Sequence, residues 1–224
     1  EEFLDLKTFK NQKDFKVVYT SLHGAGLHFV KNLLKKRLKI NLKTVKKQES
    51  FNGNFPTVSS PNPEEPQALQ LAIKQAEKQG AHLVLATDPD ADRLGVAVKT
   101  SQGYQLLNGN QLGVLMLDHL LKTRKINNSY VVSTIVSSDL IYDMAKEHNI
   151  NYAITLTGFK YIGDVLNKEE YKKSFLFVFE ESFGFLIGDY ARDKDGVSAA
   201  ALVWEMALKL KEENKTLMDA LNSL

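Results

Sequence analysis

Short apolar runs alternate with helical patterns along this chain, and that alternation most constrains its fold. Runs of apolar residues predict four strands in the first half, at residues 17–20, 42–45, 82–86 and 94–98. Similar runs predict three strands in the second half, at residues 131–135, 152–154 and 175–179. Strands that alternate with helices form sheets covered by helices. The sequence therefore predicts two α/β domains, joined near residues 104–110.

Helical spacing of apolar residues fills the gaps between these strands. One helix is predicted to begin near Gly24 and Gly26, and residues 1–9 are read as the end of another. A third is predicted to begin at Pro63, where proline loses no hydrogen bond, and to stop at Gly80. Later helices are predicted at residues 112–120, after a cap at 137–139, and at 197–210. We also expect a hairpin turn at Gly103 and a buried Trp204.

Composition narrows the classes of partner. The 224 residues are 43% hydrophobic and 25% charged, with 29 basic and 27 acidic side chains. This balance predicts neither nucleic acid nor an anionic membrane as a partner. The absence of cysteine fits a reducing, cytoplasmic location. Residues 1–5 are acidic, unlike a signal peptide, and the chain has no initiator Met, so we expect a piece of a longer chain.

The hexapeptide DPDADR at residues 88–93 carries the strongest chemical signal. It follows the apolar run at 83–86 and places three carboxylates within five residues, those of Asp88, Asp90 and Asp92. Such carboxylates repel one another unless water or a hard cation surrounds them. A set of oxygen ligands favours Mg²⁺, Mn²⁺ or Ca²⁺ over Zn²⁺. We therefore predict a cation site, with a solvated acidic turn as the simpler alternative.

Two other kinds of acidic loop share features with this hexapeptide, the EF-hand loop and the nucleophile loop of certain phosphatases. An EF-hand needs Gly and Glu where this loop has Arg93 and Lys99, so that class is excluded. In a haloacid-dehalogenase-type phosphatase the nucleophile motif resembles Asp-x-Asp-x-Thr and follows a strand. Here Asp92 stands in the position of the Thr. Residues 188–193, GDYARD, are similar to a later acidic motif of that class. A phosphatase with Asp88 as nucleophile stays an alternative.

The hexapeptide resembles the metal loop of the α-D-phosphohexomutases, the phosphoglucomutase and phosphomannomutase superfamily. Further segments resemble that superfamily in the same order: YTSLHGAG at 19–26 (with Ser21 for the usual Pro), FPT at 55–57 with PNPE at 61–64, TGFKYIG at 157–163, EESFG at 180–184 and DKDGV at 193–197. The resemblance covers essentially the whole chain. It implies two consecutive three-layer α/β domains with mixed sheets, domain two at 1–107 and domain three at 108–224.

The resemblance also implies roles for the residues of the first acidic segment. Asp88, Asp90 and Asp92 would bind one Mg²⁺ together with the phosphate of a phosphoserine. Arg93 and Lys160 are the catalytic candidates. Arg93 is expected to contact that phosphate through its guanidinium, and Lys160 to contact phosphate or transfer a proton.

The later segments imply a substrate-binding set. Glu180 and Ser182 would bind hydroxyls of the sugar, and Gly184 would allow close approach of the backbone. Lys194 is a candidate for contact with phosphate. His23 is expected near the substrate at a domain interface, with a structural histidine as the alternative. Gly24 and Gly26, which follow His23, only partly imitate a dinucleotide fingerprint, because Phe29 stands in the position of the third glycine.

Superfamily members have four domains, and the motifs of the first and the last are absent from this chain. The first supplies the phosphoserine and the last holds the distal phosphate of the substrate. The resemblance therefore implies a fragment of a mutase that interconverts hexose 1-phosphate and hexose 6-phosphate through a bisphosphate, with glucose 1,6-bisphosphate as an activator. We expect the missing domains and a hexose phosphate as partners, and no turnover by the isolated chain. Pentose phosphate stays an alternative substrate.

Overall fold

A computed structural model describes residues 3–9, 12, 14–126, 128–168 and 175–224. Residues 3–9 form turns, so the helix end predicted for this segment is wrong over its described part. The side chain of Asp5 accepts hydrogen bonds from the Lys7 amide and the Thr8 hydroxyl. A carboxylate that binds nearby donors in this way favours a turn over a helix.

The first half forms a five-stranded mixed sheet in the order β2-β1-β3-β4-β5. Its strands are β1 (Lys16–Thr20), β2 (Asn41–Thr44), β3 (Leu83–Thr87), β4 (Leu94–Thr100) and β5 (Gly103–Leu107). β1 lies parallel to β2 and β3, whereas β4 is antiparallel to β3 and β5. The turn predicted at Gly103 is confirmed, since Gly103 pairs with Thr100 at the start of the hairpin.

The second half forms a four-stranded mixed sheet in the order β7-β6-β8-β9. Its strands are β6 (Tyr130–Thr134), β7 (Asn151–Thr155), β8 (Phe175–Phe179) and β9 (Phe185–Ile187). β6 is parallel to β7 and β8, and β9 is antiparallel to β8. This is the path of β2-β1-β3-β4, so the two halves share a topology. The predicted fold of two α/β domains with mixed sheets is confirmed.

Helices connect the strands of both halves. They are α1 (Gly26–Val30), which continues as the π-helix η1 (Lys31–Arg37), the 3₁₀ turn η2 (Lys46–Gln48), α2 (Gln70–Gln79), α3 (Gly109–Thr123), α4 (Leu140–Glu147), α5 (Phe159–Leu166), α6 (Gly196–Glu212) and α7 (Leu217–Asn222). One predicted start needs correction. Turns occupy residues 63–69, so α2 begins seven residues after Pro63; it ends at Gly80 as predicted. Within the cap predicted before α4, the Ser138 hydroxyl accepts from the Leu140 amide at 3.3 Å.

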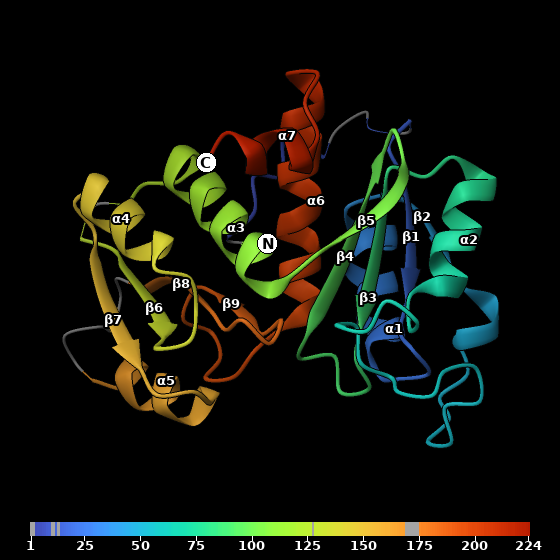
Figure 1. Ribbon diagram of the computed structural model, residues 1–224, viewed down its shortest axis with the longest axis horizontal. Coiled ribbons are helices and arrows are strands. Elements are labelled where there is room, and N and C mark those ends of the chain that lie inside the picture. The colour runs from blue at the N-terminus through green and yellow to red at the C-terminus, as the bar shows by residue number, and fades with distance from the viewer. Residues whose placement is uncertain (1–2, 10–11, 13, 127, 169–174) are drawn as a thin grey trace.

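Helix α6 lies between the two sheets and belongs to the core of both halves (Figure 1). One apolar cluster runs from β3 and β4 through α6 to β8 and β9. Trp204, in the middle of α6, is buried as predicted. Smaller clusters lie under α2 in the first half and under α5 in the second. The predicted division at residues 107 and 108 falls between β5 and α3, and it stays a prediction because the two halves share a core.

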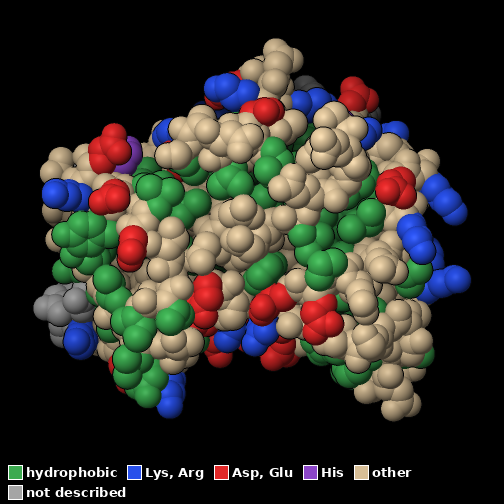
Figure 2. Space-filling view, in the orientation of Figure 1, with side chains coloured by type: hydrophobic (Ala, Val, Ile, Leu, Met, Phe, Trp, Pro, Cys, Tyr) green, Lys and Arg blue, Asp and Glu red, His purple; other side chains and the backbone are tan. Residues whose placement is uncertain are grey.

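The shared topology brings two loops together at one edge of the molecule. The acidic loop, residues 88–93, joins β3 to β4, and the facing loop, residues 180–184, joins β8 to β9. They meet through a bridge between Arg93 and Gly184, and the Leu94 amide donates to the Phe183 carbonyl at 3.0 Å. The space-filling view shows acidic and basic side chains gathered at this lower edge (Figure 2). Among the described residues, no helix is both long and apolar enough to cross a bilayer.

Candidate metal centre and the facing carboxylate loop

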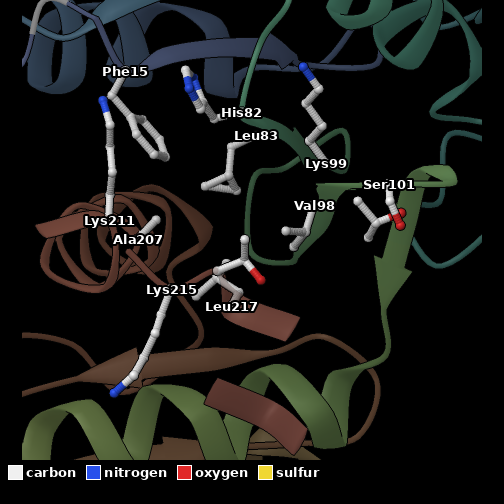
Figure 3. Close-up of a pocket in the computed structure, with 12 residues that line it drawn as sticks. Phe15, His82, Leu83, Val98, Lys99, Ser101, Ala207, Lys211, Lys215 and Leu217 are labelled. Atoms are coloured by element: carbon white, nitrogen blue, oxygen red, sulfur yellow. The ribbon is translucent and has the colours of Figure 1, made fainter. Parts of the chain in front are cut away.

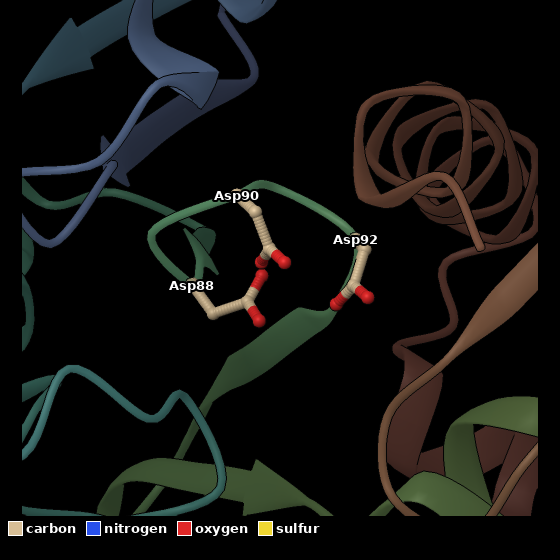
Figure 4. A group of neighbouring side chains, drawn as sticks. All are labelled: Asp88, Asp90 and Asp92. Atoms are coloured by element: carbon tan, nitrogen blue, oxygen red, sulfur yellow. The ribbon is translucent and has the colours of Figure 1, made fainter. Parts of the chain in front are cut away.

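Three carboxylates converge in the acidic loop. One oxygen from each of Asp88, Asp90 and Asp92 lies within 4.8 Å of the other two (Figure 4). β3, whose five residues are all buried, places Asp88 at its end, where only 8% of this residue is exposed. Ala91 takes a left-handed conformation with φ of 64°, which turns the loop back toward β4. The loop therefore gathers the predicted ligands around one point.

Burial and mutual repulsion disturb the ionisation of this cluster. The pKa of Asp88 is raised to about 7, mainly by burial and in addition by the negative charges of Asp92 and Asp90. The Arg93 amide donates to Asp88 Oδ1 at 2.9 Å and opposes that shift. A nearby cation would remove the repulsion by favouring the charged form of each carboxylate.

The cluster fits a hard divalent cation such as Mg²⁺. Asp92 Oδ1 is buried and has no hydrogen-bond partner in the described part of the protein. A buried carboxylate oxygen left without a donor is costly, and a metal ion would satisfy it. The donor set consists of carboxylate oxygens, which suit Mg²⁺, Mn²⁺ or Ca²⁺. The predicted ligands Asp88, Asp90 and Asp92 thus have the chemistry that such a site requires.

Arg93 is held beside the carboxylates by a residue that sequence reasoning did not select. Its Nη1 lies 3.1 Å from Glu64 Oε1, whereas its Nε is 3.9 Å from Asp88 and 4.0 Å from Asp92. The side chain is 37% exposed, so its guanidinium remains accessible. Glu64 lies in the segment PNPE, which resembles the superfamily but whose resemblance implies no role for this residue. The predicted catalytic role of Arg93 stays a prediction.

Lys194 connects the acidic loop to the facing loop. Its Nζ lies 2.9 Å from Asp92 Oδ2 and 3.3 Å from Asp193, and 5.2 Å from the centre of the Phe159 ring. The stem of the lysine crosses Gly184 so closely that a Cβ there would meet Lys194 Cδ at 2.1 Å. Gly184 was predicted to permit close approach of the backbone, and in this structure the approaching group is a side chain.

Glu180 is the buried carboxylate of the facing loop, with 4% of the residue exposed. The Gly158 amide donates to its Oε1 at 2.9 Å. Burial raises the pKa of Glu180, while the Gly158 hydrogen bond and the charge of Lys194 oppose that shift. Ser182, the other residue predicted to bind sugar, is half-buried two positions later. Both lie on the loop that faces the metal candidates.

The other predicted site residues have different surroundings. Lys160 is exposed near the start of α5, with Nζ 4.7 Å from the centre of the Tyr161 ring. His23 is buried, and both its ring nitrogens are engaged, with the Ser50 carbonyl at 3.0 Å and the Thr57 hydroxyl at 2.9 Å. This geometry favours the structural alternative for His23. Substrate binding by His23 and catalysis by Lys160 stay predictions.

Two glycines brace the loops from behind, and sequence reasoning missed this role. A Cβ on Gly24 would lie 2.4 Å from Pro89 Cα, and one on Gly109 would lie 2.0 Å from the Glu181 carbonyl oxygen. Real Cβ atoms do not come so close to other atoms. Because they lack a Cβ, Gly24 can pack directly against the acidic loop and Gly109 directly against the facing loop. Gly24 belongs to the segment HGAG, which hinted at its importance. Gly109 follows a capping residue, and its sequence surroundings carry no such signal.

Comparison with known proteins places this fold in one class, the α/β domains of phosphoglucomutases and phosphomannomutases. The family described as "Phosphoglucomutase/phosphomannomutase, alpha/beta/alpha domain II" matches residues 1–103, and domain III of the same family matches residues 108–224. The chain belongs to the phosphoglucomutase/phosphomannomutase family. It is 40% identical over 215 residues to a phosphoglucomutase of Staphylococcus haemolyticus and 38% identical to one of Staphylococcus aureus strain MRSA252. Each match covers 95% of this chain but 39% of the relative.

Solved structures agree at the level of the fold. A crystal structure assigned as a phosphomannomutase from Thermus thermophilus superposes with a TM-score of 0.80 at 23% identity, covering 99% of this chain and 47% of that one. The open form of a Paramecium phosphoglucomutase, parafusin, gives a TM-score of 0.72 at 21% identity, covering 99% of this chain and 39% of that one. The chain thus spans less than half of these proteins.

Proposed function

We propose that this chain is the cation-binding and sugar-binding part of a longer mutase that interconverts hexose 1-phosphate and hexose 6-phosphate. One observation carries the proposal: the cluster of Asp88, Asp90 and Asp92 faces the Glu180 loop, and Lys194 lies between them. A phosphosugar needs both a centre that manages phosphate charge and a set of groups that bind hydroxyls. Family membership supports pairing these two loops in one site.

The acidic loop would manage charge during phosphoryl transfer. Asp88, Asp90 and Asp92 would hold Mg²⁺, which when bound neutralises phosphate charge and draws electron density from the phosphorus. Arg93, held by Glu64 at 3.1 Å, would present its guanidinium to two phosphate oxygens. Lys194 would place a second positive charge between the phosphate and the sugar. These positive groups together offset the charge that the phosphate brings into the site.

The facing loop would bind the sugar. Glu180 Oε1 accepts from Gly158, and Oε2 makes no hydrogen bond among the described residues, so it would accept from a sugar hydroxyl. Ser182 would add a hydroxyl that both donates and accepts. Glu181 would have a structural role, since its carboxylate accepts hydrogen bonds from the Thr134 hydroxyl at 3.2 Å and the Ser137 hydroxyl at 3.4 Å. These contacts would hold the loop in position.

The rest of the parent protein would complete the reaction. We propose that a phosphoserine outside this chain gives its phosphate to the sugar phosphate, forming a bisphosphate whose other phosphate then returns to the serine. Glucose 1,6-bisphosphate would activate the parent by supplying this intermediate. Pentose phosphate stays an alternative substrate, because the carboxylate and hydroxyl of Glu180 and Ser182 do not select a ring size. In the described residues nothing favours the phosphatase alternative, and a BeF₃⁻ adduct on Asp88 would be its signature.

Two assays test the proposal. The isolated 224 residues should show no turnover of glucose 1-phosphate with Mg²⁺ and glucose 1,6-bisphosphate. In the parent protein, Asp92→Asn should lower turnover by about 100-fold or more, because one carboxylate ligand is lost. Asp14→Asn, an exposed change outside both loops, serves as the control and should keep full activity. Turnover by the isolated chain, or a fully active Asp92→Asn parent, would contradict the proposal.

A further inference from the structure

A cavity lies at the end of β3 and β4 that is opposite to the acidic loop. It is lined by the start of β3, the end of β4, the last turns of α6 and the start of α7 (Figure 3). Leu83 lines it and Asp88 lies five residues further along the chain, so roughly 17 Å of extended strand separates the two sites. The cavity therefore cannot be part of the proposed sugar-phosphate site.

Apolar side chains form the inner wall of this cavity. Its volume is about 350 Å³, which is within the range of sites for small organic ligands. The apolar lining residues are Phe15, Leu83, Val98, Ala207 and Leu217. A sugar phosphate would lose hydrogen bonds to water against such a wall without regaining them. The wall instead suits a flat apolar body.

Positive charge surrounds the same cavity. Lys99, Lys211 and Lys215 line it, and among the described residues no aspartate or glutamate does. Lys215 pairs with Glu213 at 2.8 Å, but neither Lys99 nor Lys211 has an ion-pair partner among the described residues. In Figure 3 the stems of Lys211 and Lys99 flank the cavity on two sides. An anionic group on a ligand would supply the missing counter-charge.

His82 adds a polar group at the same wall. Its ring stacks on Phe15 with centroids 4.7 Å apart, and the Lys16 amide donates to its Nδ1 at 3.2 Å. Burial lowers the pKa of His82, and the charges of Lys211 and Lys99 lower it further. With Nδ1 accepting, the neutral ring carries its proton on Nε2 and is a hydrogen-bond donor. The lysines and His82 therefore all favour a hydrogen-bond acceptor with negative charge.

We propose that this cavity between β3, β4, α6 and α7 is a binding site for a small aromatic anion, with its ring on the apolar wall and its phosphate or carboxylate between Lys99 and Lys211. The site is separate from the proposed mutase function and does not rest on it. Helix α6 links the two places, since Lys211 is near one end and the other end begins at Gly196, whose amide donates to the Ala91 carbonyl at 3.0 Å.

The probe is 1-naphthyl phosphate, titrated into the chain while backbone amides are followed by NMR. Shifts are expected at Lys99, Ser101 and Lys211, and not at Asp90 or Glu180. Inorganic phosphate and neutral 1-naphthol should each bind at least about tenfold more weakly. Inorganic phosphate has no ring for the apolar wall, and 1-naphthol has no anionic group for the lysines. 1-Naphthoate in place of the phosphate distinguishes a preference for a carboxylate from one for a phosphate, and binding by either supports the site.

Matched charge variants complete the test. The double variant Lys99→Gln and Lys211→Gln should weaken the binding of 1-naphthyl phosphate about tenfold, since two attractive charges are lost. Lys74→Gln removes an exposed lysine of α2 and should change it by less than about twofold. Equal weakening by Lys74→Gln, equal binding of inorganic phosphate alone, shifts confined to the acidic and facing loops, or no shifts at all would each overturn the proposal.

Discussion

The acidic loop and the facing loop occupy the same position in two sheets of the same topology. Each begins with a carboxylate directly after the equivalent strand of its sheet, Asp88 after β3 and Glu180 after β8. Each of these residues is buried, at 8% and 4% exposure, and burial raises the pKa of each. Each loop also contains one residue in the left-handed region, Ala91 with φ of 64° and Phe183 with φ of 66°.

The loops differ in what surrounds the first carboxylate. Asp88 has two further carboxylates beside it, and one buried oxygen of Asp92 has no donor in the described structure. Glu180 instead receives an amide from Gly158 and lies near the positive charge of Lys194. One loop therefore offers a cation three converging carboxylates and a buried oxygen without a donor, while in the other Glu180 accepts a hydrogen bond from the protein. Equivalent backbone positions can thus become a metal centre or a hydrogen-bonding site according to their neighbours.

The largest effect is expected from Gly109→Ala. The added methyl would meet the Glu181 carbonyl oxygen, so α3 or the facing loop has to shift. We expect a loss of about 3 kcal/mol in the free energy of unfolding, measured with urea. Gly53→Ala is the control, because its Cβ would have nothing within 4 Å, and it should leave the stability unchanged. A Gly109→Ala protein as stable as the Gly53→Ala control would show that the facing loop is not braced from behind.

A smaller loss is expected from Glu205→Gln in α6, the helix shared by both halves. Glu205 is fully buried and accepts from His119 at 2.8 Å, from Arg124 at 2.6 Å and from the Asp5 amide at 2.8 Å. Loss of its charge should cost about 2 kcal/mol, because Arg124 loses its partner. Both halves should still unfold in one transition. Two separate transitions would contradict the shared core that supports the two loops.

The same residue gives a pH dependence. Burial alone would raise the pKa of Glu205, but the hydrogen bonds from His119 and Arg124 outweigh it and hold that pKa below the usual 4.5. A lowered folded-state pKa contributes stability that is present above pH 4.5 and is lost as pH falls through the folded pKa. Urea unfolding between neutral and acid pH should therefore show a smaller fall in stability for Glu205→Gln than for the unmodified chain. If stability fell equally with pH in both proteins, Glu205 would not be the source of this pH dependence.

Lys194→Met should have the smallest effect, on cation affinity rather than stability. The Nζ of Lys194 lies 2.9 Å from Asp92 and competes with a cation for that carboxylate. Its removal should raise Mn²⁺ affinity about fivefold, as followed by calorimetry. Lys74→Met, which removes the same charge from exposed α2, should leave the affinity unchanged. A weaker affinity in Lys194→Met would mean that the lysine instead holds Asp92 in place for the metal.

Local sequence predicted much of the fold because the strands and most helices rest on local patterns. The acidic loop was found for the same reason, since its three carboxylates lie within five residues. By contrast, the π-helical stretch Lys31–Arg37 and the late start of α2 carry no local signal. The Asn62 side chain accepts a hydrogen bond from the Glu64 amide at 3.1 Å, which favours a turn after Pro63. Pro63 also packs against Gly95 of β4, where an added Cβ would lie 2.7 Å from Pro63 Cβ. These contacts depend on neighbours that the local pattern does not specify.

The relation between the loops could not be predicted from the pattern either. No repeat is visible in the sequence, although the two halves share a strand order. The pairing of Arg93 with Glu64 spans 29 residues, and the packing of Gly109 on Glu181 depends on the final fold. Resemblance to a family selected Glu180 and Lys194 together, but only the structure places the lysine on Asp92. Long-range contacts of this kind decide which carboxylate oxygens are left without a protein donor.

The most direct test of the central claim is the binding of Mn²⁺ to three forms of the chain, followed by electron paramagnetic resonance. If the acidic loop holds the cation and the facing loop does not, Asp92→Asn should weaken Mn²⁺ binding at least about tenfold. Glu180→Gln should change it by less than about threefold, because its carboxylate lies outside the cluster formed by Asp88, Asp90 and Asp92. Equal weakening by both substitutions, or no weakening by Asp92→Asn, would contradict the division of roles between the two loops.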